Sequence, residues 1–459
     1  MSKSMSRFVC QECGAVTSKW VGQCEICKGW NSVIEEVVSE GRATTDCPVK
    51  DDFFTALGED AEESGIAPSG RRITNIKELN RVLGGGLVDG SVILLGGSPG
   101  IGKSTILLQV LSRGAGVDES VYISAEESVN QVLLRAHRLN LSNPKLKIAS
   151  SSNIHQIISA ISELASGSIV VIDSIQTIGS DVIQSPPGSI SQVRFCTQEL
   201  VNFAKKNTVT MIIVGHITKD GAIAGPKTLE HMVDCVLYFE GDRSYDYRIL
   251  RCEKNRFGPT DEIGVFSMTG HGLEEVSNPS AAFLSGYNDD VSGVAVFSGI
   301  EGTRPILSEI QALVSHTNIA IPRRSSVGFD ANRLAMLVAV LSNRCKINFT
   351  NRDVYLNVAG GLKITEPAAD LAVVASIISS AFQKALPKQS VFFGEISLSG
   401  EIRQSHLSFA RIKESQKLGF KEIYCSHKIG DHSNEVHEIE IRKIKSIKEI
   451  INIINVSNK

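Results

Sequence analysis

The sequence predicts an α/β fold with a parallel-sheet core, a small cysteine-rich segment before it and an α+β domain after it. Three observations support this prediction. Two CxxC pairs occupy the start of the chain, a strand–glycine loop–helix pattern covers residues 91–111, and the pattern changes to short strands and helices from residue 280. A chain of 459 residues is too long for one compact domain, so several units are expected.

Composition limits the function classes. Hydrophobic residues make up 42% and charged residues 21% of the chain, and the formal net charge is −3. This balance is typical of a soluble globular protein, and nucleic-acid binding would have to depend on local patches. The N-terminal "MSKSMSRFVC" lacks the apolar core of a signal peptide. No apolar run approaches the roughly 20 residues that span a bilayer, so we expect a cytoplasmic protein without membrane partners.

The first element is a metal site. Two CxxC pairs aim four thiolates at one point, which is typical of a closed, structural zinc site with ligands Cys10, Cys13, Cys24 and Cys27. A redox CxxC needs only one pair and a thioredoxin-like fold around it. Trp20 and Trp30 flank the second pair; we expect them to pack over the metal site, the alternative being a surface for DNA or a partner.

Residues 36–66 form the second element. They are acidic, small and aperiodic, which predicts a flexible linker. The expected domains are therefore a four-cysteine zinc finger at 1–35, this linker, a motor at 67–275 and a further domain at 280–459.

The motor begins with "SVILLGGSPGIGKSTILLQVL" (91–111), an apolar strand, a glycine loop and an amphipathic helix. The loop fits GxxxxGK[ST], in which backbone N–H groups converge on phosphates. Lys103 is expected to reach the β- and γ-phosphates of ATP, and Ser104 to ligate Mg²⁺. The predicted nucleotide-binding residues are Gly97, Ser98, Pro99, Gly100, Ile101, Gly102, Lys103, Ser104 and Thr105.

Three more strands place polar residues at their ends. "GSIVVIDSI" (167–175) contains Asp173, where a Walker B carboxylate holds the Mg²⁺ shell. "SVYISAEES" (120–128) contains Glu126, expected to orient or deprotonate the attacking water; the alternative is an acid on a solvated turn. "VTMIIVGHIT" (209–218) puts His216 at its tip, as a nucleotide sensor or a structural histidine.

Strands that alternate with helices imply a parallel sheet with ATP at the strand carboxyl ends, similar to RecA-like P-loop ATPases. The motifs "GGSPGIGKST", "YISAEES", "GHITKDG", "EKNRFG", "EGTRPILSEIQALV", "GGLKITEPAADLAV" and "GEISLSGEIR" follow one another behind the cysteines. In this order they resemble the bacterial RadA (Sms) family of DNA-repair proteins. The resemblance implies a hexameric ring helicase that hydrolyses ATP, moves on single-stranded DNA and extends recombination branches with RecA recombinase.

"EKNRFG" (253–258) supplies two cations two residues apart. In a ring of RecA-like subunits, Lys254 and Arg256 are expected to offset charge on the γ-phosphoryl group bound to the neighbouring subunit. Contact with DNA phosphates is the first alternative, and a solvated surface pair is the second. The glycine-rich loop at 216–234 contributes Lys219 and Lys227 as candidate DNA contacts in the ring channel.

The C-terminal part resembles the proteolytic domain of Lon through "GEISLSGEIR" and "TEPAADLAVVASIIS". Where Lon has its nucleophilic serine after a proline, this chain has Ala368 after Pro367, and the activating lysine falls near Phe409. Since Ser–Lys catalysis requires the nucleophile, we expect no peptidase activity.

The same C-terminal part offers basic residues and a terminal helix. The candidate DNA contacts are Arg323, Arg324 and Lys363. The tail (441–459) has apolar residues at helical spacing, which predicts an amphipathic helix that packs on its own domain. The alternatives to a DNA motor are a nucleotide-switched scaffold and an ATP-dependent protease.

Overall fold

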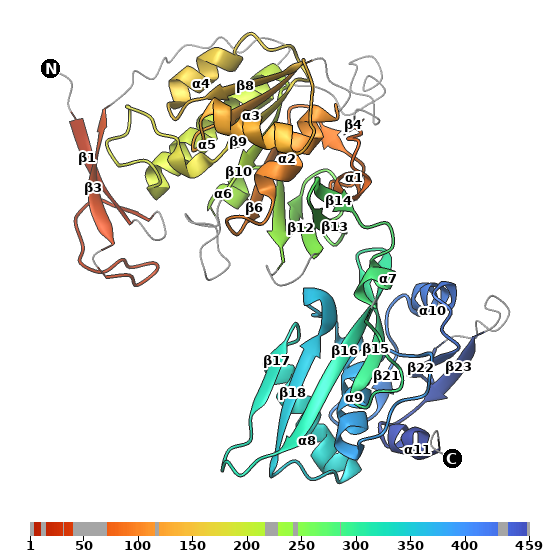
Figure 1. Ribbon diagram of the computed structural model, residues 1–459. Helices are drawn as coiled ribbons and strands as arrows, with labels where there is room; N and C mark the ends of the chain where they lie inside the picture. The colour runs from red at the N-terminus through yellow and green to blue at the C-terminus, as the bar shows by residue number, and fades with distance from the viewer. Residues whose placement is uncertain are drawn as a thin grey trace, which may run out of the picture. The chain divides into compact units, whose positions relative to one another are not determined.

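The computed structural model describes residues 4–10, 15–30, 32–39, 71–114, 119–215, 228–241, 247–284, 286–429 and 439–456 (Figure 1). The chain divides into two compact units, described here one at a time. The first comprises Met1–Glu240 and Arg248–Glu275, and the second Gly241–Tyr247 and Val276–Lys459. Four of the predicted site residues lie outside the described residues: Cys13, His216, Lys219 and Lys227.

The N-terminal segment is a three-stranded antiparallel sheet in the order β2-β1-β3, formed by β1 (Ser4–Cys10), β2 (Val16–Thr17) and β3 (Val33–Ser39). β3 continues to Ser39, so this sheet extends into the region predicted as linker. Among the described residues its core cluster is small, with Cys10, Cys24 and Val33 as the buried members. A core of this size cannot stabilise a fold by itself, which is the situation in which a structural metal is needed.

The first unit is built on a nine-stranded sheet in the order β14-β13-β12-β11-β6-β10-β9-β7-β8. The six strands from β11 to β8 in this order are parallel, and β12 pairs with β11 antiparallel. The strands are β6 (Val92–Gly97), β7 (Ser120–Ser124), β8 (Leu146–Ser150), β9 (Ile169–Asp173), β10 (Thr210–Val214), β11 (Cys235–Glu240), β12 (Tyr247–Asn255), β13 (Ile263–Thr269) and β14 (Gly272–Glu275).

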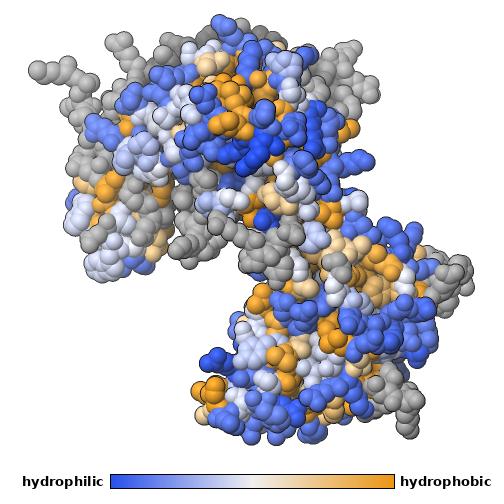
Figure 2. Space-filling view, in the orientation of Figure 1, coloured by the Kyte–Doolittle hydropathy of each residue, from blue (hydrophilic) through white to orange (hydrophobic). Residues whose placement is uncertain are grey.

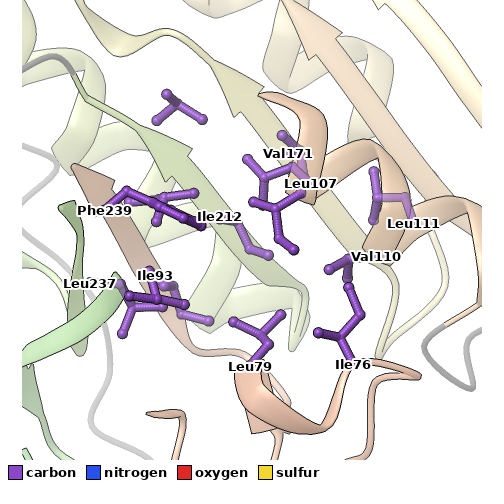
Figure 3. Close-up of a cluster of buried hydrophobic side chains, with 14 of the residues drawn as sticks. Ile76, Leu79, Ile93, Leu107, Val110, Leu111, Val171, Ile212, Leu237 and Phe239 are labelled. Atoms are coloured by element: carbon purple, nitrogen blue, oxygen red, sulfur yellow. The ribbon is translucent and has the colours of Figure 1, made fainter. Parts of the chain in front are cut away.

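Helices cover both faces of this sheet, as a parallel sheet requires. Two apolar clusters form among the described residues of this unit. One contains residues of α1 and α2, and Figure 3 shows it around Leu79 and Leu107. The other contains residues of α4 and α5. β6 is buried on both faces and carries the glycine loop. The helices are α1 (Lys77–Val82), α2 (Lys103–Ser112), α3 (Val129–Arg138), α4 (Ile154–Ile161), α5 (Ile190–Asn207) and α6 (Thr228–Met232).

The second unit has a seven-stranded mixed sheet in the order β17-β18-β16-β15-β19-β22-β23. Its strands are β15 (Val294–Glu301), β16 (Arg304–His316), β17 (Arg324–Val327), β18 (Arg352–Val358), β19 (Ser390–Phe392), β22 (Glu422–Ser426) and β23 (Glu440–Ile444); β20 (Glu395–Ile396) and β21 (Ile402–Arg403) form a separate hairpin. Its helices are α7 (Pro279–Phe283), α8 (Ala331–Cys345), α9 (Asp370–Phe382), α10 (Ser408–Lys417) and α11 (Lys448–Val456).

The tail prediction is correct in part. Helix α11 buries Ile450 and Ile454, but the segment before it is strand β23, which pairs with β22.

Hydrophilic residues cover much of the face in Figure 2, with hydrophobic areas between them. Among the described residues, no helix is both long enough and apolar enough to cross a membrane.

Candidate functional site

The glycine loop leaves β6 at Gly97 and enters α2 at Lys103, so the N-terminus of α2 points its free N–H groups at the loop. Glycine is required at Gly102, which has φ of 121°. A Cβ atom there would lie 3.0 Å from Met268 Cε and from Leu273 Cδ1. The loop therefore keeps the shape that lets phosphate oxygens approach the backbone closely.

Lys103 lies inside this loop. Its ammonium donates hydrogen bonds to the carbonyl oxygens of Gly97, at 2.6 Å, and Ser98, at 3.1 Å. Burial lowers the pKa of Lys103, while the nearby carboxylates of Asp173 and Glu126 act in the opposite direction. The structure thus brings Lys103, Asp173 and Glu126, which come from three separate segments, close enough to interact electrostatically.

Tyr122 joins the two predicted Mg²⁺ ligands. Its hydroxyl donates a hydrogen bond to Asp173 Oδ2 and also interacts with Ser104. Burial and the adjacent Asp173 raise the pKa of Tyr122, so the phenol stays protonated and works as a donor. Sequence reasoning missed this residue. A tyrosine inside an apolar strand could have indicated it, because a buried hydroxyl needs a hydrogen-bond partner.

The adjacent acids Glu126 and Glu127 have different surroundings. Glu127 forms an ion pair with Arg135 of α3, whereas Glu126 accepts a hydrogen bond from Ser174, which follows β9. Of these two adjacent acids, Glu126 is the one that, after Asp173, acts to raise the pKa of Lys103. Because the charge of Glu127 is paired, the arrangement favours Glu126 as the carboxylate that would handle a water molecule.

These groups line one cleft of about 500 Å³, within the range of about 300–1,000 Å³ usual for small-molecule sites. Both acidic and basic side chains line it, the combination that a magnesium–triphosphate complex requires. Sequence reasoning missed Arg138 and Arg248, which also line the cleft. The lining residues include Pro99, Gly100, Gly102, Lys103, Ser104, Thr105, Ser124, Glu126, Glu127, Arg135, Arg138, Asp173, Arg248 and Met268.

Lys254 and Arg256 lie at the opposite edge of the sheet from this cleft. Asn255, between them, pairs with Cys235, and Cys235 pairs with Ile93 near the start of β6. The P-loop begins at the other end of β6, at Gly97, about 13 Å from Ile93 at the rise of an extended strand. The two cations therefore cannot reach the nucleotide bound to their own P-loop.

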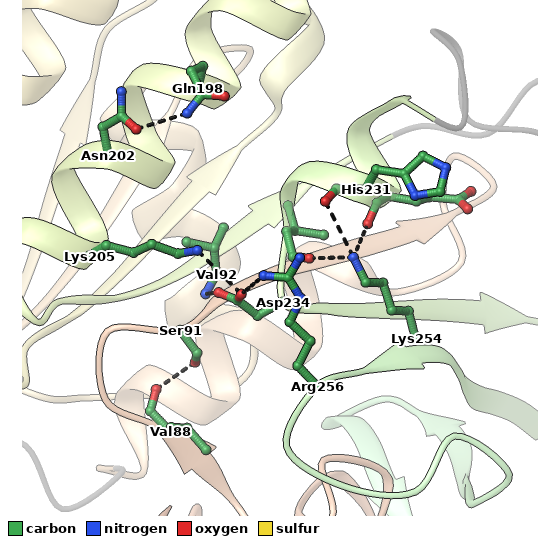
Figure 4. Close-up of polar contacts among 12 residues, drawn as sticks. Val88, Ser91, Val92, Gln198, Asn202, Lys205, His231, Asp234, Lys254 and Arg256 are labelled. Atoms are coloured by element: carbon green, nitrogen blue, oxygen red, sulfur yellow. Dashed lines mark hydrogen bonds and ion pairs between the residues drawn. The ribbon is translucent and has the colours of Figure 1, made fainter. Parts of the chain in front are cut away.

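Each of these two cations has a defined partner (Figure 4). The Lys254 ammonium donates to the carbonyl oxygens of Glu230, at 2.7 Å, and Val233, at 2.8 Å, at the end of α6. Arg256 Nη1 donates to Asp234 Oδ1 at 2.9 Å. The Arg256 side chain is nevertheless 50% exposed, so it is available to a group from outside the chain.

The cysteine cluster fits a zinc ion. The sulfurs of Cys10, Cys24 and Cys27 all lie within 4.8 Å of one another, and those of Cys10 and Cys27 are 3.6 Å apart. Tetrahedral coordination with Zn–S bonds of 2.3 Å places sulfurs about 3.8 Å apart. The two tryptophans, expected to pack over the metal site, are not buried there: Trp20 is 59% and Trp30 72% exposed.

Removing zinc is expected to unfold the segment that contains β1 to β3, because metal binding supplies the folding free energy of such sites, about 10–16 kcal/mol. Cys24→Ser should lower bound zinc and remove amide protection from strands β1 and β3. The measurement combines metal analysis with hydrogen exchange by mass spectrometry. Cys345→Ser is the matched control, since Cys345 lies in α8 of the second unit. Full zinc content in Cys24→Ser would contradict the site.

The Lon-like part places an ion pair next to the position of the missing nucleophile. Ala368 is buried, and Glu366 pairs with Arg411 of α10, whose side chain is fully buried against Phe297 and Phe393. Phe409, the position predicted for the activating lysine, is only half-buried, and the buried cation lies two residues further on. A guanidinium held by a carboxylate cannot serve as a general base.

The three candidate DNA contacts in this unit differ. Arg323 and Lys363 have exposed side chains. Arg324 instead donates to the carbonyl oxygens of Arg352, at 2.6 Å, and Phe349, at 3.1 Å. Arg324 is therefore engaged by its own chain, and Arg323 and Lys363 remain the better candidates.

These features define the class of protein: a RecA-like P-loop ATPase with an N-terminal zinc ribbon and a Lon-like C-terminal domain. Three family models match separate parts of the chain. They are an ATPase model, KaiC, at residues 73–148; the rubredoxin metal binding domain at residues 8–35; and subunit ChlI of Mg-chelatase at residues 312–428. The RadB recombinase crystal structure aligns with a TM-score of 0.37 at 22% identity, covering 45% of this chain and 100% of that chain. That score is too low to support an argument.

Similarity to whole proteins is much stronger. The chain is 53% identical over 428 residues to DNA repair protein RadA of Rickettsia felis, covering 93% of this chain and 95% of that protein. It is 48% identical over 426 residues to DNA repair protein RadA of Bacillus subtilis, covering 92% of this chain and 93% of that protein. The chain belongs to the RadA family of DNA repair proteins.

Proposed function

We propose that this protein is a DNA-dependent ATPase of recombinational repair. It assembles into a hexameric ring, translocates on single-stranded DNA and extends recombination branches with RecA recombinase. Its membership of a DNA-repair family supports the repair role, and the cleft at the end of β6 supports ATP hydrolysis. The zinc ribbon and the exposed cations of both units are its candidate DNA-contacting parts.

The observation that carries this proposal is the separation of Lys254 and Arg256 from their own P-loop. Both cations lie at the start of β6, and the P-loop lies at its end. Such cations reach a nucleotide only when a neighbouring subunit presents its cleft to them, which is the geometry of a ring. Hydrolysis therefore depends on assembly, as a motor that steps subunit by subunit requires.

Within each site the chain's own residues divide the work. Lys103 and the N-terminus of α2 hold the phosphates, and Ser104 and Asp173 hold the shell of Mg²⁺, which neutralises phosphate charge when bound. Glu126 orients the attacking water while Ser174 fixes its carboxylate. Lys254 and Arg256 of the neighbouring subunit stabilise the negative charge that develops on the transferred group.

The proposal is tested by steady-state ATP hydrolysis with and without single-stranded DNA, with Lys103→Ala as the blank. Strong stimulation by DNA is expected, and displacement of a strand from a forked substrate is the next measurement. No stimulation, with zinc bound and the protein assembled, would overturn the motor and favour a nucleotide-switched scaffold. Digestion of casein with ATP tests the protease alternative, and none is expected because Ala368 lacks a nucleophile.

A further inference from the structure

Asp234 is a buried carboxylate outside the nucleotide cleft. It precedes β11, and its side chain is 5% exposed. A buried carboxylate is stable only when it is paired and hydrogen-bonded. Asp234 Oδ2 accepts a hydrogen bond from the backbone N–H of Val92 at 3.1 Å, and Asp234 Oδ1 accepts one from Arg256 at 2.9 Å (Figure 4). Lys205 of α5 lies 3.6 Å from the same Oδ1.

The backbone holds this carboxylate firmly. The N–H of Asp234 donates to the carbonyl oxygen of Val92 at 2.9 Å, and the N–H of Arg256 donates to the carbonyl oxygen of Asp234 at 3.0 Å. Arg256 is thus held at two points, its main chain and its guanidinium. Two contacts restrict a long side chain that otherwise has many rotamers. Both contacts are with Asp234, which is itself hydrogen-bonded to Val92 of β6, the strand that leads to the P-loop.

The cluster carries more positive than negative charge. Lys205, Lys254 and Arg256 share the neighbourhood with two carboxylates, Asp234 and Glu230. The pKa of Lys254 is lowered, first by burial and then by Arg256. The Lys205 and Arg256 side chains are 49% and 50% exposed. The excess charge faces solvent, where an anion from another molecule can approach it.

We infer that Asp234 is a positioning residue for ATP hydrolysis: through its ion pair it holds Arg256 in the orientation that reaches the γ-phosphate bound to the neighbouring subunit. Asp234 itself does not touch the nucleotide. The inference rests on the proposed function, in which Arg256 acts on a neighbour. A latch is the opposite possibility, in which Asp234 holds Arg256 away from the phosphate.

Asp234→Asn tests the inference with little disturbance, because asparagine keeps an acceptor for the Val92 N–H and loses the charge that holds Arg256. We expect kcat for ATP to fall by about 10- to 100-fold, the effect of a small misplacement of a catalytic group, with KM nearly unchanged. Asp234→Asn subunits mixed with Lys103→Ala subunits should regain hydrolysis. In the mixed ring, Lys103→Ala subunits present a correctly held Arg256 to intact P-loops.

Glu78→Gln is the matched control. Glu78 is also a buried carboxylate; it accepts a hydrogen bond from the Val265 N–H at 3.0 Å and lies 3.8 Å from Arg81. The kcat of Glu78→Gln should match that of the unaltered protein. Three results would overturn the inference. They are an unchanged kcat for Asp234→Asn, faster hydrolysis by Asp234→Asn, which indicates a latch, and a loss that mixing does not repair, which indicates structural damage.

The failure of the proposed function would look different. In that case Arg256→Ala itself would hydrolyse ATP at the normal rate, and the inference would fall with it. If Arg256→Ala is inactive and Asp234→Asn is normal, only the role of Asp234 fails.

Discussion

Arg256→Ala is expected to abolish almost all ATP hydrolysis by the assembled protein while ATP binding remains. Trans-acting arginines contribute about 10³–10⁵ in rate because they stabilise charge that appears only in the transition state. The measurement is kcat at saturating ATP, together with binding of a fluorescent ATP analogue. Binding should persist because Lys103 and the loop around it lie at the other end of β6.

Subunit mixing shows whether Arg256 acts in trans. Neither Arg256→Ala nor Lys103→Ala should hydrolyse ATP alone, but a mixture should, because some sites combine an intact P-loop with a neighbour's Arg256. Arg251→Ala is the matched control, since Arg251 lies on β12, the strand that ends just before Arg256, and pairs with Glu240 at 3.5 Å. Normal hydrolysis by Arg256→Ala would contradict the trans role and would favour DNA contact or a solvated surface pair.

The sequence predicted the parts of the site that lie in continuous motifs. The strand before the P-loop, the loop and the helix after it are found in the structure at β6 and α2, and Asp173 ends β9 as expected. These positions could be predicted because phosphate binding imposes a local pattern of glycine, lysine and hydroxyl residues. The functions of the individual site residues remain predictions.

The sequence did not predict the residues that support the site. Tyr122 donates a hydrogen bond to Asp173, Ser174 donates one to Glu126, and Asp234 accepts one from Arg256. Each of these contacts joins different strands or loops, so it depends on sheet order and register. The register between β11 and β12 even shifts at a bulge between Val236 and Leu237, which no periodicity in the sequence indicates. Local patterns therefore identify residues that touch a ligand better than residues that hold them in place.

The tail shows a similar limit. Apolar residues at 441–459 predicted one helix, yet the first part forms edge strand β23 beside β22. A short apolar run fits helical or strand spacing equally well, and tertiary pairing decides between them.

Glu126→Gln is expected to lower kcat by about 10²–10⁴-fold, the usual contribution of general acid–base catalysis, with ATP still bound. Glutamine keeps the shape of Glu126 and an acceptor for the Ser174 hydroxyl, but it cannot take a proton or hold a water molecule with a charge. The measurement is single-turnover hydrolysis with excess enzyme, which separates the chemical step from product release.

The neighbouring acid, Glu127, provides the control for this prediction. Glu127 is paired with Arg135, so Glu127→Gln should lower kcat less than Glu126→Gln does. The expected decrease is about 10-fold or below, the usual scale of losing a partly exposed ion pair. If Glu127→Gln were the inactive variant and Glu126→Gln nearly normal, the water would be oriented by the paired carboxylate. Arg135 would then have to release Glu127 during turnover, and Arg135→Ala would raise the rate, whereas our assignment predicts no gain from that change.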